Sequence, residues 1–216
     1  MPIKKEMSDL LIKWYKKNCR QYPWRENTDP YRVLIAEIML QRTKADQVVP
    51  TYLSFLERFP NFQKLNSASE EDLTKFFYRL GLVHRSKYVK MLATDVILRF
   101  NGKIPENRNE LLSLPAVGEY VADAVLCFAF NKPSSIVDSN VCRVIGRVFD
   151  LTAKGEARRD PKFRKKADEL LPETKVNEYN WAVIDLAALI CIPKKPLHSI
   201  CPLRKICASV KKRDIV

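Results

Sequence analysis

The chain has little glycine, little histidine and no long apolar segment. Its 216 residues include 5 glycines and 2 histidines, and uncharged apolar runs such as residues 124–130 are short. A membrane-spanning helix needs ~20 such residues, and the first residues also lack the long apolar segment of a secretory signal. We therefore expect a protein of the cytoplasm, associated with the nucleoid in a prokaryote, or of the nucleus, and neither a secreted nor a membrane protein.

Sustained alternation of polar and apolar residues, the pattern of a half-buried β-strand, is also missing. Helix signals recur instead. Asp29 and Asp160 each precede a proline, which places a capping carboxylate before the first helical residue. Ser67 and Glu70 have the spacing of a capping box. Because the chain also lacks internal repeats and low-complexity linkers, the sequence predicts an all-α fold of about ten helices.

Acidic residues are outnumbered by basic ones. The chain has 38 Lys and Arg against 25 Asp and Glu, a formal net charge of +13, and is still 46% hydrophobic. This combination favours a folded protein whose partner is a polyanion, most simply nucleic acid. The charge alone does not identify the partner, because ribosome-associated proteins and many thermophilic enzymes are equally basic.

Among the few glycines, Gly118 lies in a turn between two helical patterns, "NELLSL" and "EYVADAVLCFAF". The turn is too short for anything but a helical hairpin. A helix-hairpin-helix turn presents backbone N–H groups and a helix N-terminus, which together suit one DNA phosphate. An ordinary corner between two helices that binds nothing remains the alternative.

Two carboxylates are candidate site residues. Asp138 lies 20 residues beyond Gly118, after an apolar run and before the helical pattern "NVCRVIGRVF". It can be a helix N-cap and can also face a cleft, since these two roles are compatible. Glu37 is the one charged residue in "VLIAEIML". We expect burial to raise its pKa if it is part of a site; a salt-bridged structural role is the alternative.

Three of the six cysteines gather near the C-terminus with one of the histidines. The spacing is Cys191-X6-His198-X2-Cys201-X5-Cys207, which places four potential ligands within 17 residues. Three thiolates and one imidazole can hold either a tetrahedral zinc ion or an iron–sulfur cluster, and spacing does not choose between them. The other cysteines are scattered, which argues for reduced thiols and one metal site over a disulfide framework. The lysines and arginines of the same loop would suit contact with a DNA backbone.

Three motifs, in this order, resemble those of the helix-hairpin-helix base-excision DNA glycosylases of the endonuclease III superfamily. They are the hairpin "LPAVGEY", the aspartate of "VDSN", and the terminal cysteine cluster. The resemblance covers almost the whole chain and implies two helical lobes flanking a DNA-binding active-site cleft. One would be a helical barrel over residues 24–130 that ends in the helix-hairpin-helix. The other would combine residues 1–23 with residues 131–216, which carry the metal-cluster loop.

Residue 120 separates two reaction types within that superfamily. Bifunctional members carry a lysine there, which attacks the sugar C1′ and forms a Schiff base, whereas this chain has Tyr120. The resemblance therefore implies a monofunctional hydrolase without efficient AP lyase activity, in which Asp138 supports the attacking water. Glu37 would line the base pocket, in contact with the base or as a proton donor, and Tyr120 would form part of the pocket wall.

The segment "PWR…DPY…EIMLQRT" looks like the branch shared by adenine glycosylases and mismatch-specific thymine/uracil glycosylases. Where the adenine group has Gln-Gln, this chain has Gln41-Arg42, and Leu82 stands where that group has a tyrosine. An arginine and a leucine at such positions fill the gap left by a flipped base in the thymine/uracil group. The chain also ends soon after the cluster, whereas adenine glycosylases usually continue into a second domain. The resemblance therefore favours excision of thymine or uracil mispaired with guanine.

Two residues depart from the family pattern. Ala116 replaces the usual first glycine of the hairpin, which raises the question of how closely its backbone approaches a phosphate. His198 replaces the second cysteine of the cluster. The cofactor that the resemblance implies is thus a [4Fe-4S] cluster with three cysteine ligands and one histidine, with zinc as the alternative.

The expected partner is double-stranded DNA with a mismatched or damaged base, bound by a monomeric enzyme through Gln41, Arg42, Leu82, Ala116 and Gly118. Two other functions stay open. One is an adenine glycosylase that acts on A·G or A·8-oxoguanine mismatches. The other is a catalytically silent DNA-binding or redox-sensing protein that uses the cluster as a switch.

Overall fold

The computed structural model describes residues 2–213 and confirms the all-α fold. It has thirteen α-helices and three 3₁₀ helices, and no strand in that range. Two predicted caps are in place: the side chain of Asp29 accepts a hydrogen bond from the Arg32 N–H, and that of Asp160 accepts one from the Lys162 N–H. The capping box was predicted two residues too early. Its helix begins after Ser69, because the Ser69 hydroxyl reaches the N–H of Asp72.

The chain divides into two compact units, each described separately below. Unit 1 consists of residues 1–20 and 131–216, and unit 2 of residues 21–130. No helix among residues 2–213 is both long enough and apolar enough to cross a membrane.

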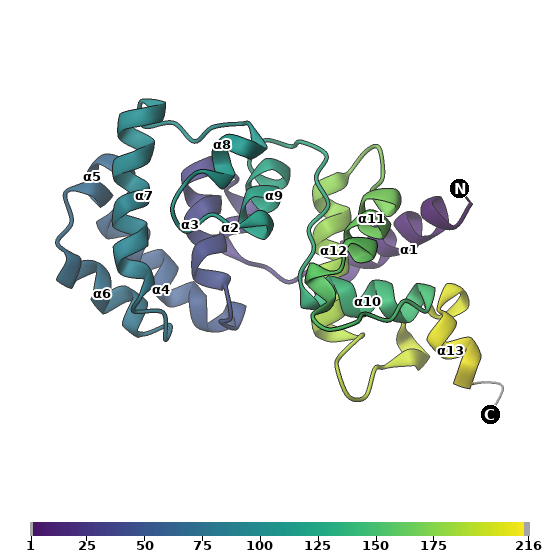
Figure 1. The fold of residues 1–216 in the computed structure, drawn as a ribbon. Coiled ribbons are helices and arrows are strands. Elements are labelled where there is room, and N and C mark those ends of the chain that lie inside the picture. The colour runs from purple at the N-terminus through teal and green to yellow at the C-terminus, as the bar shows by residue number, and fades with distance from the viewer. Residues whose placement is uncertain (1, 214–216) are drawn as a thin grey trace. The chain divides into compact units, whose positions relative to one another are not determined.

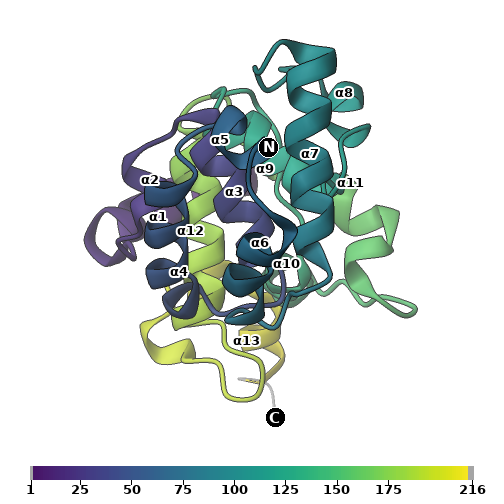
Figure 2. The same ribbon diagram turned by 90° about the vertical axis from the view of Figure 1, so that its left-hand side faces the viewer.

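Unit 2 is built around one buried helix. Tyr31 and residues 33–39 of α3 are buried, so this helix has almost no solvent-facing side. It packs against α2, α4 and α9, while α7 packs along α5 and α6 (Figure 2). The helices are α2 (Pro23–Glu26), α3 (Pro30–Leu40), α4 (Ala45–Arg58), α5 (Phe62–Asn66), α6 (Glu70–Tyr78), α7 (Arg85–Phe100), α8 (Arg108–Leu112) and α9 (Glu119–Phe128).

Unit 1 brings the two ends of the chain together. Helix α12 packs against α1 and α10, and α10 also packs against α11 and α13 (Figure 1). Its core holds apolar side chains from all five of these helices, and Cys191 and Cys207 are part of it. The helices are α1 (Pro2–Asn18), α10 (Ser139–Phe149), η1 (Ala157–Arg159), α11 (Pro161–Leu170), α12 (Val176–Leu189), η2 (His198–Ile200), η3 (Arg204–Ile206) and α13 (Ala208–Arg213).

A buried ion pair fastens the N-terminal segment to the core of unit 1. The Arg20 Nε donates to Asp185 Oδ1 at 2.7 Å, and the Arg20 backbone N–H donates to Oδ2 at 3.0 Å. The Asp185 side chain is 0% exposed and that of Arg20 is 25% exposed. Because a buried carboxylate is costly without its partners, this pair holds residues close to the unit boundary in place.

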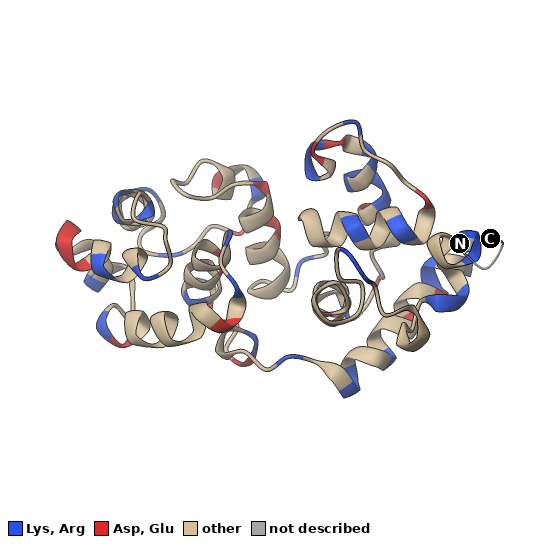
Figure 3. Ribbon diagram, turned by 90° about the horizontal axis from the view of Figure 1, so that it is seen from below, with Lys and Arg blue, Asp and Glu red and all other residues tan. Residues whose placement is uncertain are grey.

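The positive charge is distributed very unevenly between the units (Figure 3). Unit 1 has 24 Lys and Arg against 12 Asp and Glu, a net charge of +12, whereas unit 2 has 14 against 13, a net charge of +1. Residues 186–213 of unit 1 contain no acidic residue at all. Almost all of the long-range attraction for a polyanion therefore originates in unit 1.

Candidate DNA-binding and catalytic residues

The predicted hairpin joins α8 to α9 in unit 2. Ala116 has a left-handed backbone with φ 65°, whereas Gly118 is extended with φ −95° and serves as the N-cap of α9 without a side-chain hydrogen bond. The first N–H groups of a helix have no partner within the helix, so the turn offers donors to an anion. A Cβ built on Gly118 would meet no atom within 4 Å. The turn is therefore open where a ligand would approach.

Ala116→Gly and Gly118→Ala are expected to have opposite effects. Glycine removes the steric cost of the left-handed alanine, so Ala116→Gly raises the free energy of unfolding by about 0.5–1 kcal/mol and keeps DNA affinity. Gly118→Ala costs at most about 1 kcal/mol of cap stability. Its methyl group would stand in the open side of the turn, so affinity for duplex DNA falls about tenfold or more, a loss of at least about 1.4 kcal/mol. Denaturant unfolding and fluorescence anisotropy measure both effects. Equal DNA affinity in the two variants would contradict the phosphate role.

Tyr120 follows the hairpin as the second residue of α9 and is half-buried. An ion pair joins the two helices of the hairpin. The nearly buried carboxylate of Asp123 on α9 lies 3.0 Å from the Arg108 Nε on α8. This ion pair fixes the two helices on either side of the turn. Tyr120 and the first N–H groups of α9 are thus positioned on one rigid support.

Asp138 is the N-cap of α10, which is one of the two compatible roles expected for it. Its Oδ1 accepts the Val141 N–H at 2.7 Å and its Oδ2 accepts the Asn140 Nδ2 at 2.8 Å. The side chain remains half-exposed. Both oxygens are therefore oriented by the protein, while solvent can still reach the carboxylate.

A hydrogen-bond chain continues from Asp138 along α10 to the cysteine loop. The Asn140 Oδ1 accepts Arg143 Nη1 at 3.1 Å, and Arg143 Nε donates to the Cys191 carbonyl at 2.8 Å. Arg143 Nη2 also donates to the Ala187 carbonyl at 2.9 Å, near the C-terminus of α12. Such arginine contacts satisfy carbonyls that a helix end leaves without partners. The carboxylate and the first predicted ligand thus share one framework of hydrogen bonds.

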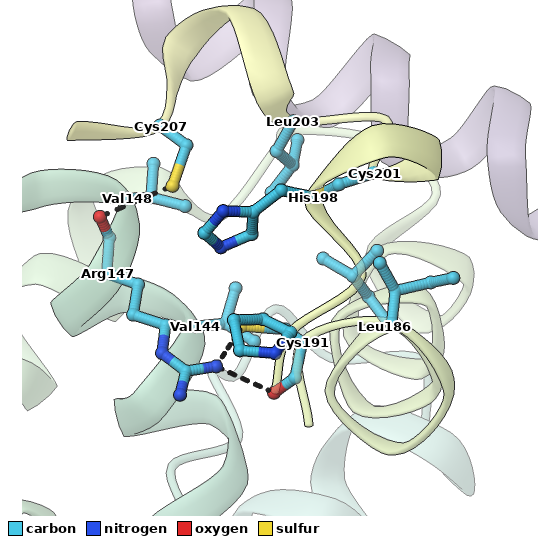
Figure 4. A pocket seen from close by; sticks show the side chains of 11 residues that line it. Val144, Arg147, Val148, Leu186, Cys191, His198, Cys201, Leu203 and Cys207 are labelled. Carbon is cyan, nitrogen blue, oxygen red and sulfur yellow. Dashed lines mark hydrogen bonds between the residues drawn. The ribbon is translucent and has the colours of Figure 1, made fainter. Parts of the chain in front are cut away.

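The four predicted ligands line one pocket in unit 1. Cys191, His198, Cys201 and Cys207 surround it together with apolar side chains that include Val144 and Leu186. Figure 4 shows the His198 imidazole and the Cys207 thiol facing the same space. Among residues 2–213, no three His, Cys, Asp or Glu side chains come close enough to hold a single metal ion. The ligands therefore surround a volume and do not converge on one point.

These thiols are largely buried, and two of them contact Arg147. Arg147 Nη1 lies 3.3 Å from the Cys191 Sγ and donates to the Ile192 carbonyl at 2.7 Å. The Cys207 Sγ donates to the Arg147 carbonyl at 3.4 Å. Burial raises the pKa of the Cys201 thiol to about 11, and Cys191 and Cys207 add to this.

Glu37 is buried as expected, in the middle of α3, with 4% of its surface exposed. Its Oε2 is buried and makes no hydrogen bond, although the side chain has other interactions. A carboxylate among seven other buried residues of α3 is an unusual choice for a structural helix. It is therefore the strongest candidate in this unit for a group that contacts a substrate.

The expected insertion residues differ in accessibility. Arg42 is exposed at the turn after α3, with a left-handed φ of 63°, and Gln41 before it is half-buried. Leu82 is only 4% exposed, whereas the next residue, Val83, is 42% exposed. The expectation that Leu82 is presented to DNA is thus not met in this conformation, because its side chain packs into unit 2. Insertion by Leu82 would require the turn to open.

Asn140, Arg143 and Arg147 were not singled out from the sequence. Their positions in "NVCRVIGRVF" are three and four residues apart, so they share one face of a helix. The spacing was visible, but arginine on a helix face most often meets solvent. The two arginines belong to the site because they donate hydrogen bonds to carbonyls at and just after the C-terminus of α12. The sequence alone does not show that α12 lies beside α10.

These features define an all-helical DNA-binding protein with a helix-hairpin-helix turn and a capped aspartate. The chain belongs to the HhH-GPD superfamily of base excision DNA repair proteins, whose family model matches residues 35–173. A thymine/uracil-DNA glycosylase of Pyrobaculum aerophilum is 38% identical over 96% of this chain and 93% of that protein. A thymine-DNA glycosylase of Aeropyrum pernix is also 38% identical, over 91% of each.

Three further similarities agree with this assignment. The structure of a thermostable thymine-DNA glycosylase matches with a TM-score of 0.91 and 33% identity over 97% of each chain. An adenine DNA glycosylase of Buchnera aphidicola is 33% identical over 92% of this chain and 57% of that protein. A structure of endonuclease III trapped on DNA, 22% identical with a TM-score of 0.84, shares the fold.

Proposed function

We propose that this protein is a monofunctional DNA glycosylase that hydrolyses the N-glycosidic bond of thymine or uracil mispaired with guanine. The observation that carries the proposal is Asp138, held half-exposed at the start of α10 by Val141 and Asn140. Tyr120, and not a lysine, follows the hairpin. The similarity to two thymine glycosylases over more than nine tenths of the chain supports the choice of base.

Asp138 would act on the sugar. Breaking the bond between base and C1′ develops positive charge on the sugar, as in glycosidase transition states. A fixed carboxylate stabilises that charge and can orient or deprotonate the attacking water. The hydrogen bonds from Val141 and Asn140 keep both carboxylate oxygens in place, so little reorganisation is needed when the charge forms.

The residues of unit 2 would hold the DNA and the base. The target nucleotide must leave the duplex, which costs a few kcal/mol and least at a mismatch. Arg42 and, after opening of its turn, Leu82 would fill the gap, while Gln41 contacts neighbouring bases. The backbone at Ala116 and Gly118 would bind a flanking phosphate. Glu37 and Tyr120 would line the pocket that receives the base.

Glu37→Gln separates the proposed function from the adenine alternative. The 33% identity to an adenine DNA glycosylase is the observation behind the adenine alternative. Excision of adenine requires protonation of a ring nitrogen. A glutamine cannot supply that proton, so the variant would lose adenine release by about a hundredfold or more. Release of thymine from G·T is expected to fall by less than about tenfold, a cost below about 1.4 kcal/mol. The rate of base release from both mismatches is the measurement.

The resemblance of the terminal cysteine motif implies a [4Fe-4S] cluster. We propose that Cys191, His198, Cys201 and Cys207 hold such a cluster here, because they line one pocket without converging on a point. A [4Fe-4S] cluster would supply metal–ligand bonds that cross-link the loop and a redox-active centre. Arg147 would donate a hydrogen bond to the sulfur of one ligand. Iron and sulfide analysis with the absorption spectrum of purified protein distinguishes this cluster from zinc.

Strand scission tests the monofunctional reaction. Duplexes with one G·T or G·U pair are incubated with the enzyme, and half of each sample is then treated with alkali. We expect free base in the untreated and the alkali-treated half of each sample, and broken strands only in the alkali-treated half. Breaks without alkali would contradict the role of Tyr120, and DNA binding without any base release would leave the non-catalytic alternative.

A further inference from the structure

The segment that leads into Asp138 has no regular secondary structure. Residues 131–138 lie between α9 and α10 and belong to neither helix nor strand. The bonds that Asp138 receives from Val141 and Asn140 orient its carboxylate relative to α10. They do not hold the backbone on the N-terminal side of Asp138. That backbone needs hydrogen-bond partners from other parts of unit 1.

A buried side chain of α12 supplies two of these bonds. Asn180 is 4% exposed. Its Nδ2 donates to the Ser134 carbonyl at 3.0 Å, and its Oδ1 accepts the Ile136 N–H at 3.4 Å. In an extended chain these two backbone groups point to the same side. The side-chain amide therefore bonds to the segment as one residue of a neighbouring parallel strand would.

The middle residue of the segment bonds to α11 instead. Arg164 Nη1 donates to the Ser135 carbonyl at 2.6 Å and lies 3.2 Å from its hydroxyl oxygen. The same hydroxyl donates to the Asp168 carboxylate. Ser135 is only 3% exposed, so these bonds lie within the folded unit. The segment is thus held from α12 at Ser134 and Ile136, and from α11 at Ser135.

The amide of Asn180 also fixes the register of the segment. The same helix contributes Ala182 and Val183 to the apolar core of unit 1, and a buried amide without partners is costly. A shift of the segment by one residue would turn the bonded carbonyl and N–H to the other side. Asp138 lies two residues beyond Ile136, so the register of the segment decides where its carboxylate lies.

We propose that Asn180 is a positioning residue that acts on the reaction through Asp138. Its amide sets the place and the register of the backbone that carries the carboxylate, and Arg164 supports the same segment from α11. A misplacement of a reacting group by about 1 Å can lower a rate about a hundredfold. The inference rests on the proposed function only in taking Asp138 as the carboxylate that acts on the sugar.

Asn180→Leu is the test variant, because leucine is similar in size and removes both bonds to the segment. We expect the single-turnover rate of base release to fall about a hundredfold at unchanged DNA affinity. Leu11→Ala is the control for lost stability, since Leu11 on α1 is fully buried in the core of unit 1 and makes no hydrogen bond to the segment through its side chain. Thermal unfolding compares the two variants. The rate of Leu11→Ala should stay within about threefold of wild type at temperatures where it is folded.

Two further readouts separate positioning from a merely structural role. Hydrogen exchange of the backbone amides in residues 134–138 should be faster in Asn180→Leu than in Leu11→Ala, because only the former loses bonds to this segment. In an Asp138→Asn background, Asn180→Leu should lower the remaining rate by less than about threefold, because residues that act through one group are not additive.

The outcomes distinguish this inference from the proposed function. If Asn180→Leu does not fold, Arg164→Gln decides by the same readouts, with an expected fall in rate of about tenfold. A folded Asn180→Leu that releases base as fast as Leu11→Ala overturns the inference. An equal loss of rate with and without the Asp138 carboxylate overturns it too, and in both cases the proposed function stands. If wild type releases no base although Asn180→Leu speeds exchange at residues 134–138, only the proposed function fails.

Discussion

Asp138→Asn is expected to lower the single-turnover rate of base release by about a thousandfold or more. The substitution removes the negative charge that would stabilise the developing oxocarbenium ion. It does not remove the helix cap, because asparagine is as good an N-cap as aspartate and its Oδ1 can still accept the Val141 N–H. The unfolding free energy therefore stays within about 1 kcal/mol of wild type, and DNA affinity is retained.

Asp160→Asn is the matched control for this prediction. Asp160 is also an N-cap in unit 1, at the start of α11, where its side chain accepts the Lys162 N–H. The control therefore makes the same change of charge in the same structural role. Its rate of base release should stay within about twofold of wild type, less than about 0.5 kcal/mol in the barrier. A folded Asp138→Asn enzyme that kept more than about a tenth of the activity would contradict the catalytic assignment.

Arg20→Met is expected to have the largest effect on stability, a loss of about 3 kcal/mol in the free energy of unfolding. It removes the guanidinium that pairs with Asp185 at 2.7 Å and leaves a carboxylate that is 0% exposed. Most of the cost is the desolvation of that charge. The double variant Arg20→Met, Asp185→Leu should regain much of the loss, since an apolar pair of similar volume can replace a buried ion pair.

Chemical denaturation of the four members of this cycle measures the effect. Arg58→Met provides the comparison, because Arg58 and Asp72 form an exposed pair at the same 2.7 Å. Exposed pairs contribute about 0–1 kcal/mol, so Arg58→Met should change stability by less than about 1 kcal/mol. Equal effects of Arg20→Met and Arg58→Met would show that burial of Asp185 does not govern the stability of unit 1.

Local signals in the sequence predicted the helices well. The Asp-Pro starts at Asp29 and Asp160 hold because cap and proline act within one turn. Ser67 and Ser69 both have an acidic residue three positions later, so the pattern alone does not separate them. The same locality explains why the cap at Asp138 and the burial of Glu37 could be predicted.

Features that depend on distant packing could not be predicted. Leu82 was expected to face DNA, but its backbone N–H bonds to the Phe77 carbonyl and its side chain turns into the core of unit 2. The path from Asn140 through Arg143 to Cys191 needs α10 and α12 to be neighbours. Each of these depends on contacts between residues far apart in the sequence.

Base release under single-turnover conditions tests the central claim most directly. Four duplexes of identical sequence carry G·T, G·U, A·G or A·8-oxoguanine at one position, and the rate of base release is measured for each. We expect thymine and uracil to be released at rates at least about a hundredfold above that of adenine, a difference of about 2.7 kcal/mol in the barrier. Faster release of adenine would contradict it and would identify the protein as an adenine glycosylase.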